Sequence, residues 1–129
     1  MSESTKSLPP ISADDAAGYP LTEYGPMSPS VGVPLDGPMS HRGMSIWDSP
    51  DGKIMTGLWE CDAGRFRADF PDDSGEMVHL VKGRMTCTND DGTVMELAAG
   101  DVTTFAPGWR GVWDCHEPMR KFYTVFKLG

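Results

Sequence analysis

Three residues that could do chemistry, Asp72, Glu76 and His79, lie close together in the segment GRFRADFPDDSGEMVHLVKG, from Gly64 to Gly83. Carboxylate and imidazole groups bind divalent metals and move protons in acid–base catalysis. Successive side chains along a strand point to opposite faces, so Glu76 and His79 cannot face the same way unless a β-bulge separates them. If Glu76 points inward, the segment does not assemble a histidine–carboxylate metal site by itself.

Glu76 is the most informative of these residues. A carboxylate buried among apolar side chains costs several kcal/mol unless a cation compensates it or it is protonated. We expect Lys121 to be that cation, with Arg110 as the second candidate. A paired Glu76 could bind or deprotonate a ligand, and an unpaired one could act as a general acid or base. An ion pair that only shapes the fold is an equally good interpretation.

The other histidines and the cysteines predict no second site. His41 lies in a turn-like stretch, so we expect it at the surface, and we expect His116 to point outward. Cys61, Cys87 and Cys115 contain no CxxC pair, and their odd number does not fit a disulfide framework. Buried, reduced cysteines are the interpretation that fits this spacing.

Length and charge exclude several classes of protein. The 129 residues suffice for one domain, and 19 acidic against 11 basic residues give a net charge of −8. Such a charge disfavours nucleic acid and anionic membranes as partners. No apolar run of about 18 residues is present, and the first residues do not resemble a secretory signal. We therefore expect a cytoplasmic protein with no nucleic-acid or membrane partner.

Short strands must position these side chains. From about residue 44 onward, apolar stretches alternate with turns rich in Gly, Asp and Pro, and no stretch supports a long amphipathic helix. The turn at residues 89–92 predicts a hairpin between strands 84–88 and 93–97, with a type I turn and a glycine bulge. The pattern predicts an all-β sandwich or barrel. The expected strands cover residues 43–49, 53–61, 65–70, 76–82, 84–88, 93–97, 101–106, 111–115 and 120–127.

Residues 1–37 differ in composition from the rest of the chain. They contain six of the eleven prolines and show no sustained period of 3.6 or 2, so the segment cannot form a core of its own. Two interpretations stay open: disorder, or an extended arm laid on the body or on a partner subunit. We therefore divide the chain into an N-terminal arm, residues 1–37, and a barrel, residues 38–129. We expect a homodimer to which the arm contributes contacts.

Two segments resemble the cupin motifs. Gly64, Phe70, Asp72, Glu76 and Gly83 follow the spacing of the first motif, in which the positions of Phe70 and Asp72 are usually histidines. The segment GDVTTFAPGWRG, residues 100–111, resembles the second motif, and its last glycine stands where a metal-binding histidine would lie.

Further stretches narrow the resemblance to one group of cupins. GLWECDAGRF, the APGW at residues 106–109 and the closing RKFYTVF are similar to small single-domain, RmlC-like cupins of the DUF861 type, which include ethanolamine-utilisation and ureidoglycine-related proteins. The resemblance covers about residues 54–127. It implies a double-stranded β-helix, which is a small jelly-roll barrel.

The resemblance also bears on a metal cofactor. In the family, about three imidazoles and one carboxylate hold Fe, Mn, Ni or Zn. Here Phe70 and Gly111 cannot ligate through a side chain, and only Asp72 could replace a histidine. We therefore expect no bound metal, although a metal-dependent enzyme of nitrogen or ureide metabolism stays an alternative.

Without a metal, the remaining candidate site is a pocket inside the barrel. Barrels of this size either hold one small ligand or are filled by side chains. Aromatic walls with one or two acids suit a small polar or cationic molecule. The hypothesis is thus a metal-independent small-molecule pocket, and whether it catalyses a reaction stays open. The alternative is a non-catalytic structural or interaction protein with a filled barrel. The residues assigned to the pocket are Phe70, Asp72, Glu76, Gly111, Trp113, Cys115 and Lys121.

Overall fold

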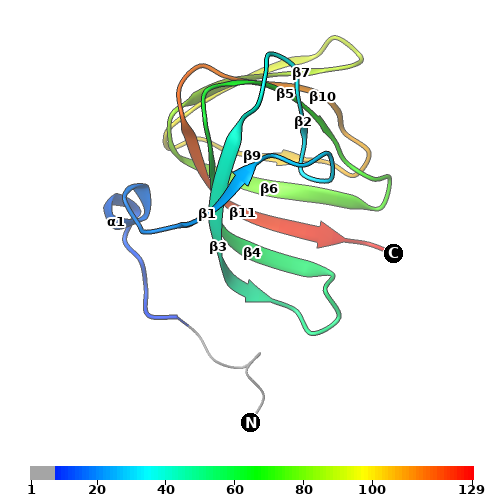
Figure 1. Cartoon of the computed structure of the whole chain (residues 1–129). Helices are drawn as coiled ribbons and strands as arrows, with labels where there is room; N and C mark the ends of the chain where they lie inside the picture. Colours follow the sequence, from blue (N-terminus) through cyan, green and yellow to red (C-terminus); the bar gives the residue numbers. More distant parts are fainter. Residues whose placement is uncertain (1–7) are drawn as a thin grey trace.

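Two antiparallel sheets face each other in the structure, a computed structural model that describes residues 8–129 (Figure 1). The result is the all-β jelly-roll barrel that the sequence predicts. In order across it, the six-stranded sheet contains β1 (Thr22–Pro26), β3 (Ser40–Asp48), β4 (Ile54–Cys61), β11 (Met119–Lys127), β6 (Ser74–Lys82) and β9 (Val102–Phe105). The five-stranded sheet contains β2 (Val33–Pro34), β5 (Gly64–Asp69), β10 (Arg110–Cys115), β7 (Arg84–Asn89) and β8 (Val94–Ala98).

Strand β6 shows the alternation that the sequence predicts. Glu76, Val78 and Leu80 are buried on the inner face of the six-stranded sheet, whereas Met77 is half exposed. Each residue from Glu76 to His79 pairs in turn with β11 and with β9, so no bulge interrupts this stretch. His79 therefore lies on the face opposite Glu76, in agreement with the prediction.

The predicted hairpin joins β7 and β8. The Gly92 N–H donates to the Asn89 carbonyl at 2.8 Å, and the Asn89 N–H donates to the Thr93 carbonyl at 2.9 Å. Gly92 has a φ of 93°, a conformation that glycine adopts without a steric penalty. Thr88 and Val94 then pair across the hairpin, within one residue of the predicted strand ends.

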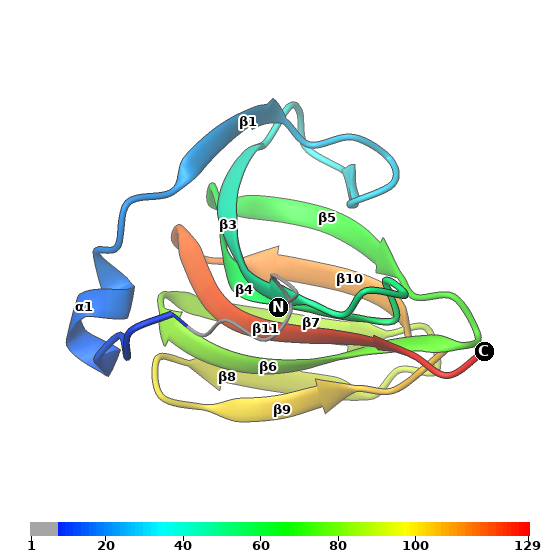
Figure 2. The same ribbon diagram turned by 90° about the horizontal axis from the view of Figure 1, so that it is seen from below.

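The N-terminal segment lies against the body of its own chain. Strand β1 pairs with β3 and strand β2 pairs with β5, so the described part of the segment extends both sheets. Before them, the short helix α1 (Ala13–Ala17) lies outside the barrel, as Figure 2 shows from below. Residues 1–7 of the predicted arm lie outside the described residues, and the homodimer stays a prediction.

Helix α1 was not predicted from the sequence, although its start signal is present. The Ser12 Oγ accepts the Asp15 backbone N–H at 3.0 Å, and Asp14 and Asp15 occupy the first turn. A serine before an acidic first turn is a helix start signal, because it satisfies a free N–H and the acids face the positive end of the helix dipole.

Among residues 8–129, no helix is long and apolar enough to cross a membrane.

Aromatic and sulfur-containing side chains fill much of the space between the sheets. Phe66, Phe105 and Trp113 are almost completely buried, and the Phe105 and Trp113 rings lie 4.7 Å apart. All three cysteines are free and buried, as predicted. Burial raises the pKa of Cys87 to about 12, although the nearby Lys121 charge opposes the rise, so this thiol stays neutral.

Candidate functional site

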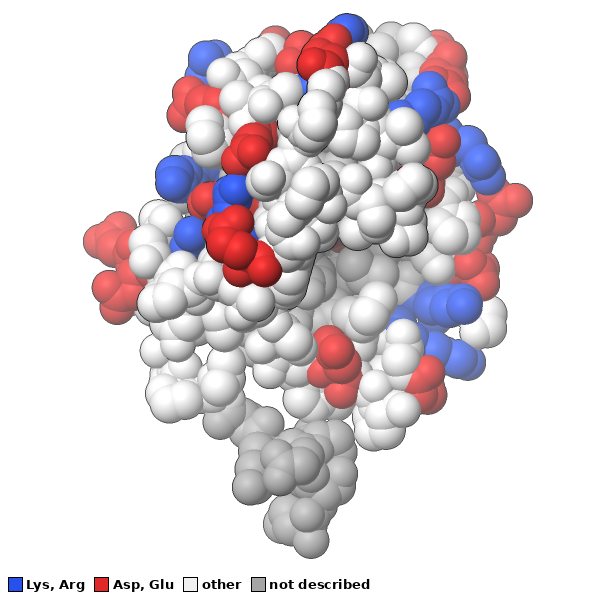
Figure 3. Space-filling view, in the orientation of Figure 1, with Lys and Arg blue, Asp and Glu red and all other residues white. Residues whose placement is uncertain are grey.

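A cavity of about 430 Å³ lies between the two sheets. Both sheets contribute to its wall, because the inward-facing residues of β4, β6 and β11 lie opposite those of β5 and β10. Figure 3 shows a hollow on this side of the molecule, surrounded mostly by uncharged residues. Its wall includes Trp59, Phe66, Phe70, Glu76, Trp113, Lys121 and Tyr123.

The predicted ion pair lies in this wall. The Lys121 Nζ donates to the Glu76 Oε2 at 2.6 Å, and the two side chains are only 8% and 4% exposed. In the pairing of β11 with β6, Lys121 lies opposite Leu80 and Val125 lies opposite Glu76. Glu76 and Leu80 share one face of β6, so the Lys121 and Glu76 side chains point to the same face and reach each other. Arg110, the second candidate, instead lies 3.3 Å from Asp72 at the surface.

Three aromatic rings surround the Lys121 ammonium. Its Nζ lies 4.6 Å from the centre of the Trp113 ring, 4.7 Å from that of Trp59 and 5.9 Å from that of Tyr123. Ring faces attract a cation, and the attraction strengthens where water is excluded. The positive charge is thus compensated by a carboxylate and by ring faces, which removes most of the cost of burying it.

Four of the seven predicted pocket residues line the cavity: Phe70, Glu76, Trp113 and Lys121. The structure places the other three elsewhere. The Asp72 side chain is 90% exposed, because β5 ends at Asp69 and the strand alternation does not continue through the turn. Cys115 is buried in the core, with its sulfur 3.7 Å from that of Cys61.

Gly111 is buried in β10 and is not part of the cavity wall. A Cβ atom at this position would press on the Thr88 backbone carbonyl and would lie 2.9 Å from the Trp109 ring. Because the obstacle is backbone, any side chain here would displace the neighbouring strand. The structure thus explains why a glycine stands where the cupin motif has a histidine.

Sequence reasoning missed several residues of the site. The expectation that His41 lies at the surface is wrong: it is 8% exposed within β3, and its Nδ1 accepts the Trp59 indole N–H at 3.0 Å. Burial, followed by the Arg42 charge, lowers the pKa of His41, which keeps the imidazole neutral and able to accept this hydrogen bond. His41 therefore holds one wall of the cavity in position.

Two further polar groups belong to residues of the wall. The Trp113 indole N–H is buried and has no hydrogen-bond partner among the described residues. Burial, with smaller contributions from Asp48, Tyr24 and Glu76, raises the pKa of Tyr123 to about 12, so its phenol stays protonated. A buried donor without a partner costs free energy, so the Trp113 N–H is an unfavourable feature of the wall.

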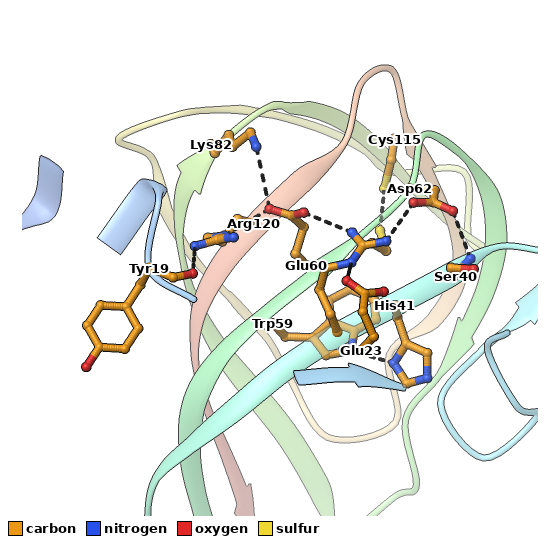
Figure 4. A network of polar contacts seen from close by, with 12 residues as sticks. Tyr19, Glu23, Ser40, His41, Trp59, Glu60, Asp62, Lys82, Cys115 and Arg120 are labelled. Carbon is orange, nitrogen blue, oxygen red and sulfur yellow. Dashed lines mark hydrogen bonds and ion pairs between the residues drawn. The ribbon is translucent and has the colours of Figure 1, made fainter. Parts of the chain in front are cut away.

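The N-terminal segment is part of the site, because Ser30 and Val31 also line the cavity. Figure 4 shows the polar network that ties this segment to the barrel. The Arg120 guanidinium donates to the carbonyls of Ala16 and Tyr19 at 2.9 and 2.7 Å, and to the Glu60 Oε1 at 2.9 Å. Arg120 and Lys121 are adjacent in β11 and point to opposite faces, so Arg120 reaches the N-terminal segment and Lys121 reaches the cavity.

Glu60 is the centre of this network. It also accepts from the Arg42 Nη1 at 2.9 Å and lies 3.6 Å from the Lys82 Nζ. Burial alone would raise the pKa of Glu60, but Arg120, Lys82 and Arg42 outweigh burial and hold the pKa below its ordinary value. Three cations thus keep the carboxylate ionised, which suits a structural anchor rather than a proton-transfer group.

The residues at the cupin ligand positions do not fit a metal. Phe70 offers no donor atom, Asp72 points into solvent and Gly111 has no side chain. Glu76 is already paired with Lys121, whose positive charge opposes a second cation. Between residues 8 and 129, no three His, Cys, Asp or Glu side chains are grouped so that they could hold a metal ion.

We therefore expect purified protein to contain no stoichiometric Mn, Fe, Ni or Zn, because the donor set is too poor for tight binding. Elemental analysis of the purified full-length chain measures this directly. A metal content of about one atom per chain that disappears in Glu76→Gln would contradict the expectation.

A comparison with protein families identifies the chain. Residues 48–123 match the model of the EutQ-like cupin domain, which is more than half of the sequence. The chain belongs to the EutQ-like cupin family. No curated protein matches this EutQ-like cupin.

Solved structures agree with the family. A DUF861 protein of unknown function from Pseudomonas syringae has a TM-score of 0.68 and 22% identity, over 82% of this chain and 44% of its own. A DUF861 protein from Thermotoga maritima has a TM-score of 0.50 and 32% identity, over 54% of this chain and 76% of its own. A putative ethanolamine utilization protein Q from Salmonella typhimurium has a TM-score of 0.58 and 15% identity, over 85% of this chain and 96% of its own. This EutQ-like cupin thus spans less than half the length of the Pseudomonas protein, and the likenesses to that protein and to the Salmonella protein show the fold alone.

Proposed function

We propose that this EutQ-like cupin binds a small neutral molecule in the barrel cavity, without a metal, through Lys121 and Glu76. The observation that carries the proposal is a buried ion pair at the wall of a cavity of about 430 Å³. This volume lies within the usual range of small-molecule sites. The filled-barrel alternative does not account for a lysine and a glutamate that line such a space.

The charges of the site favour a neutral ligand. Lys121 and Glu76 compensate each other, so a ligand with its own charge would leave one unbalanced charge inside the barrel. The balance of these two charges disfavours the cationic ligand that aromatic walls with one or two acids suggested. A neutral ligand can instead accept from the Lys121 ammonium and donate to the Glu76 carboxylate, as a carboxamide does.

The aromatic wall specifies the rest of the ligand. Trp59 and Phe70, which are only partly buried, offer apolar surface for the remainder of the molecule. Benzamide combines a carbonyl oxygen, an N–H donor and an apolar ring, and is therefore a suitable probe.

We expect benzamide to shift the indole N–H signals of Trp59 and Trp113 in nuclear magnetic resonance spectra of the labelled chain. Trp47 and Trp109 lie outside the cavity wall and serve as internal controls. Benzoate and benzylammonium keep the ring but carry a charge, so both should bind more weakly. The proposal fails if no shift appears at about 10 mM benzamide, which would saturate a site with a Kd of ~1 mM. It also fails if a charged analogue binds better.

A further inference from the structure

We propose that Lys121 forms a reversible imine with a small aldehyde that enters the cavity. The inference rests on the proposed function and names the ligand class of the same site. Three features carry it: the amine lines the cavity, a carboxylate lies at hydrogen-bond distance from it, and aromatic rings surround it.

Lys121 has the proton acceptor that imine formation needs. A lysine attacks a carbonyl carbon only as the neutral amine, so the ammonium must first lose a proton. The Glu76 Oε2, at 2.6 Å from the Nζ, is placed to take that proton. The other lysines of the described residues differ, because Lys53 and Lys127 are exposed and the Lys82 side chain is 48% exposed.

The surroundings of Lys121 suit the product as well as the free side chain. A protonated imine is a cation at the same nitrogen, so the rings of Trp59, Trp113 and Tyr123 can stabilise it as they stabilise the ammonium. Glu76 remains its counterion. No new buried charge is created, and the desolvation cost of the site stays unchanged.

The step balances without an oxidant or reductant. The lysine proton passes to Glu76, and the amine nitrogen forms a bond to the aldehyde carbon while the carbonyl electron pair moves to oxygen. That oxygen takes the proton back from Glu76 and becomes the hydroxyl of a carbinolamine. The carbinolamine nitrogen still carries two protons and the positive charge, so it first gives one proton to Glu76. Its freed lone pair then forms the C=N bond as the C–O bond breaks, and the oxygen takes that proton and leaves as water. The lysine ammonium and the aldehyde thus become protonated imine and water with no net gain or loss of a proton, and a ligand that cannot form an imine leaves Lys121 unchanged.

Reductive trapping tests the inference on the full-length chain. Benzaldehyde, which matches benzamide in ring and size, is added with cyanoborohydride, and the modified lysines are located by peptide mass mapping. We expect Lys121 to be modified about ten-fold faster than Lys53 or Lys127, although it is far less exposed, because the cavity concentrates and orients the aldehyde. An excess of benzamide should slow the reaction at Lys121 and leave Lys53 unaffected.

Glu76→Gln separates the chemistry from simple access. The change is expected to slow modification of Lys121 while the exposed lysines react as before, in protein whose indole N–H signals show an intact fold. Equal or slower labelling of Lys121 relative to Lys53 in the unmodified chain overturns the inference. If benzamide shifts the Trp59 and Trp113 signals but Lys121 is not labelled, the imine fails and the proposed function stands. If benzamide shifts neither signal and Lys121 is not labelled, the imine and the proposed function both fail.

Discussion

Lys121→Met is expected to lower the free energy of unfolding by about 3–5 kcal/mol, because it leaves the Glu76 carboxylate buried without its cation. Glu76 is 3% exposed, and Lys121 is the one hydrogen-bond partner of its side chain among the described residues. The change also removes a cation from three aromatic faces, which adds to the loss. Urea denaturation followed by tryptophan fluorescence measures the effect.

A double-mutant cycle shows whether the loss comes from the pair itself. Glu76→Gln combined with Lys121→Met should cost less than Lys121→Met alone, because no charge is left stranded in the barrel. Lys53→Met, at an exposed lysine, is the matched control and should change the stability little. Simple addition of the two single effects would mean that the residues do not interact in solution.

Gly111→Ala is expected to destabilise the chain by about 3 kcal/mol or more, since inserting even one methyl group into a closely packed region forces the backbone to move. Gly111 pairs with Ala68 on one side and with Asn89 on the other, so β10 cannot shift without disturbing both neighbours. The new Cβ would press on the Thr88 carbonyl oxygen, which is backbone and cannot rotate away. Denaturant midpoints of the variant and the parent chain give the comparison.

Gly18→Ala is the matched control for this prediction. Gly18 has a φ of −118°, and nothing lies within 4 Å of the position its Cβ would take, so the same added methyl group should have a small effect. Gly111→His should be at least as disruptive as Gly111→Ala and should not create a metal ligand. A stable Gly111→His protein that binds Mn with Glu76 would contradict this account of the site.

The sequence by itself determined the local structure of this cupin. Alternation along β6 predicted that Glu76, Val78 and Leu80 share the buried face, and the residues at 89–92 predicted the hairpin turn. These features depend on neighbours in the sequence, where a two-residue period and glycine conformation suffice. The need to compensate a buried carboxylate left Lys121 and Arg110 as candidates, the cupin resemblance favoured Lys121, and the structure contains the Glu76–Lys121 ion pair.

Only the tertiary structure decided which side chains meet around the cavity. Asp72 leaves the site because β5 ends at Asp69, and alternation says nothing beyond a strand end. Trp59 joins the site because β4 pairs with β11 so that it lies beside Lys121, and His41 then fixes its indole. Ser30 and Val31 reach the wall because β2 adds to β5. Strand order and register arise from the packing of distant segments, which no local pattern encodes.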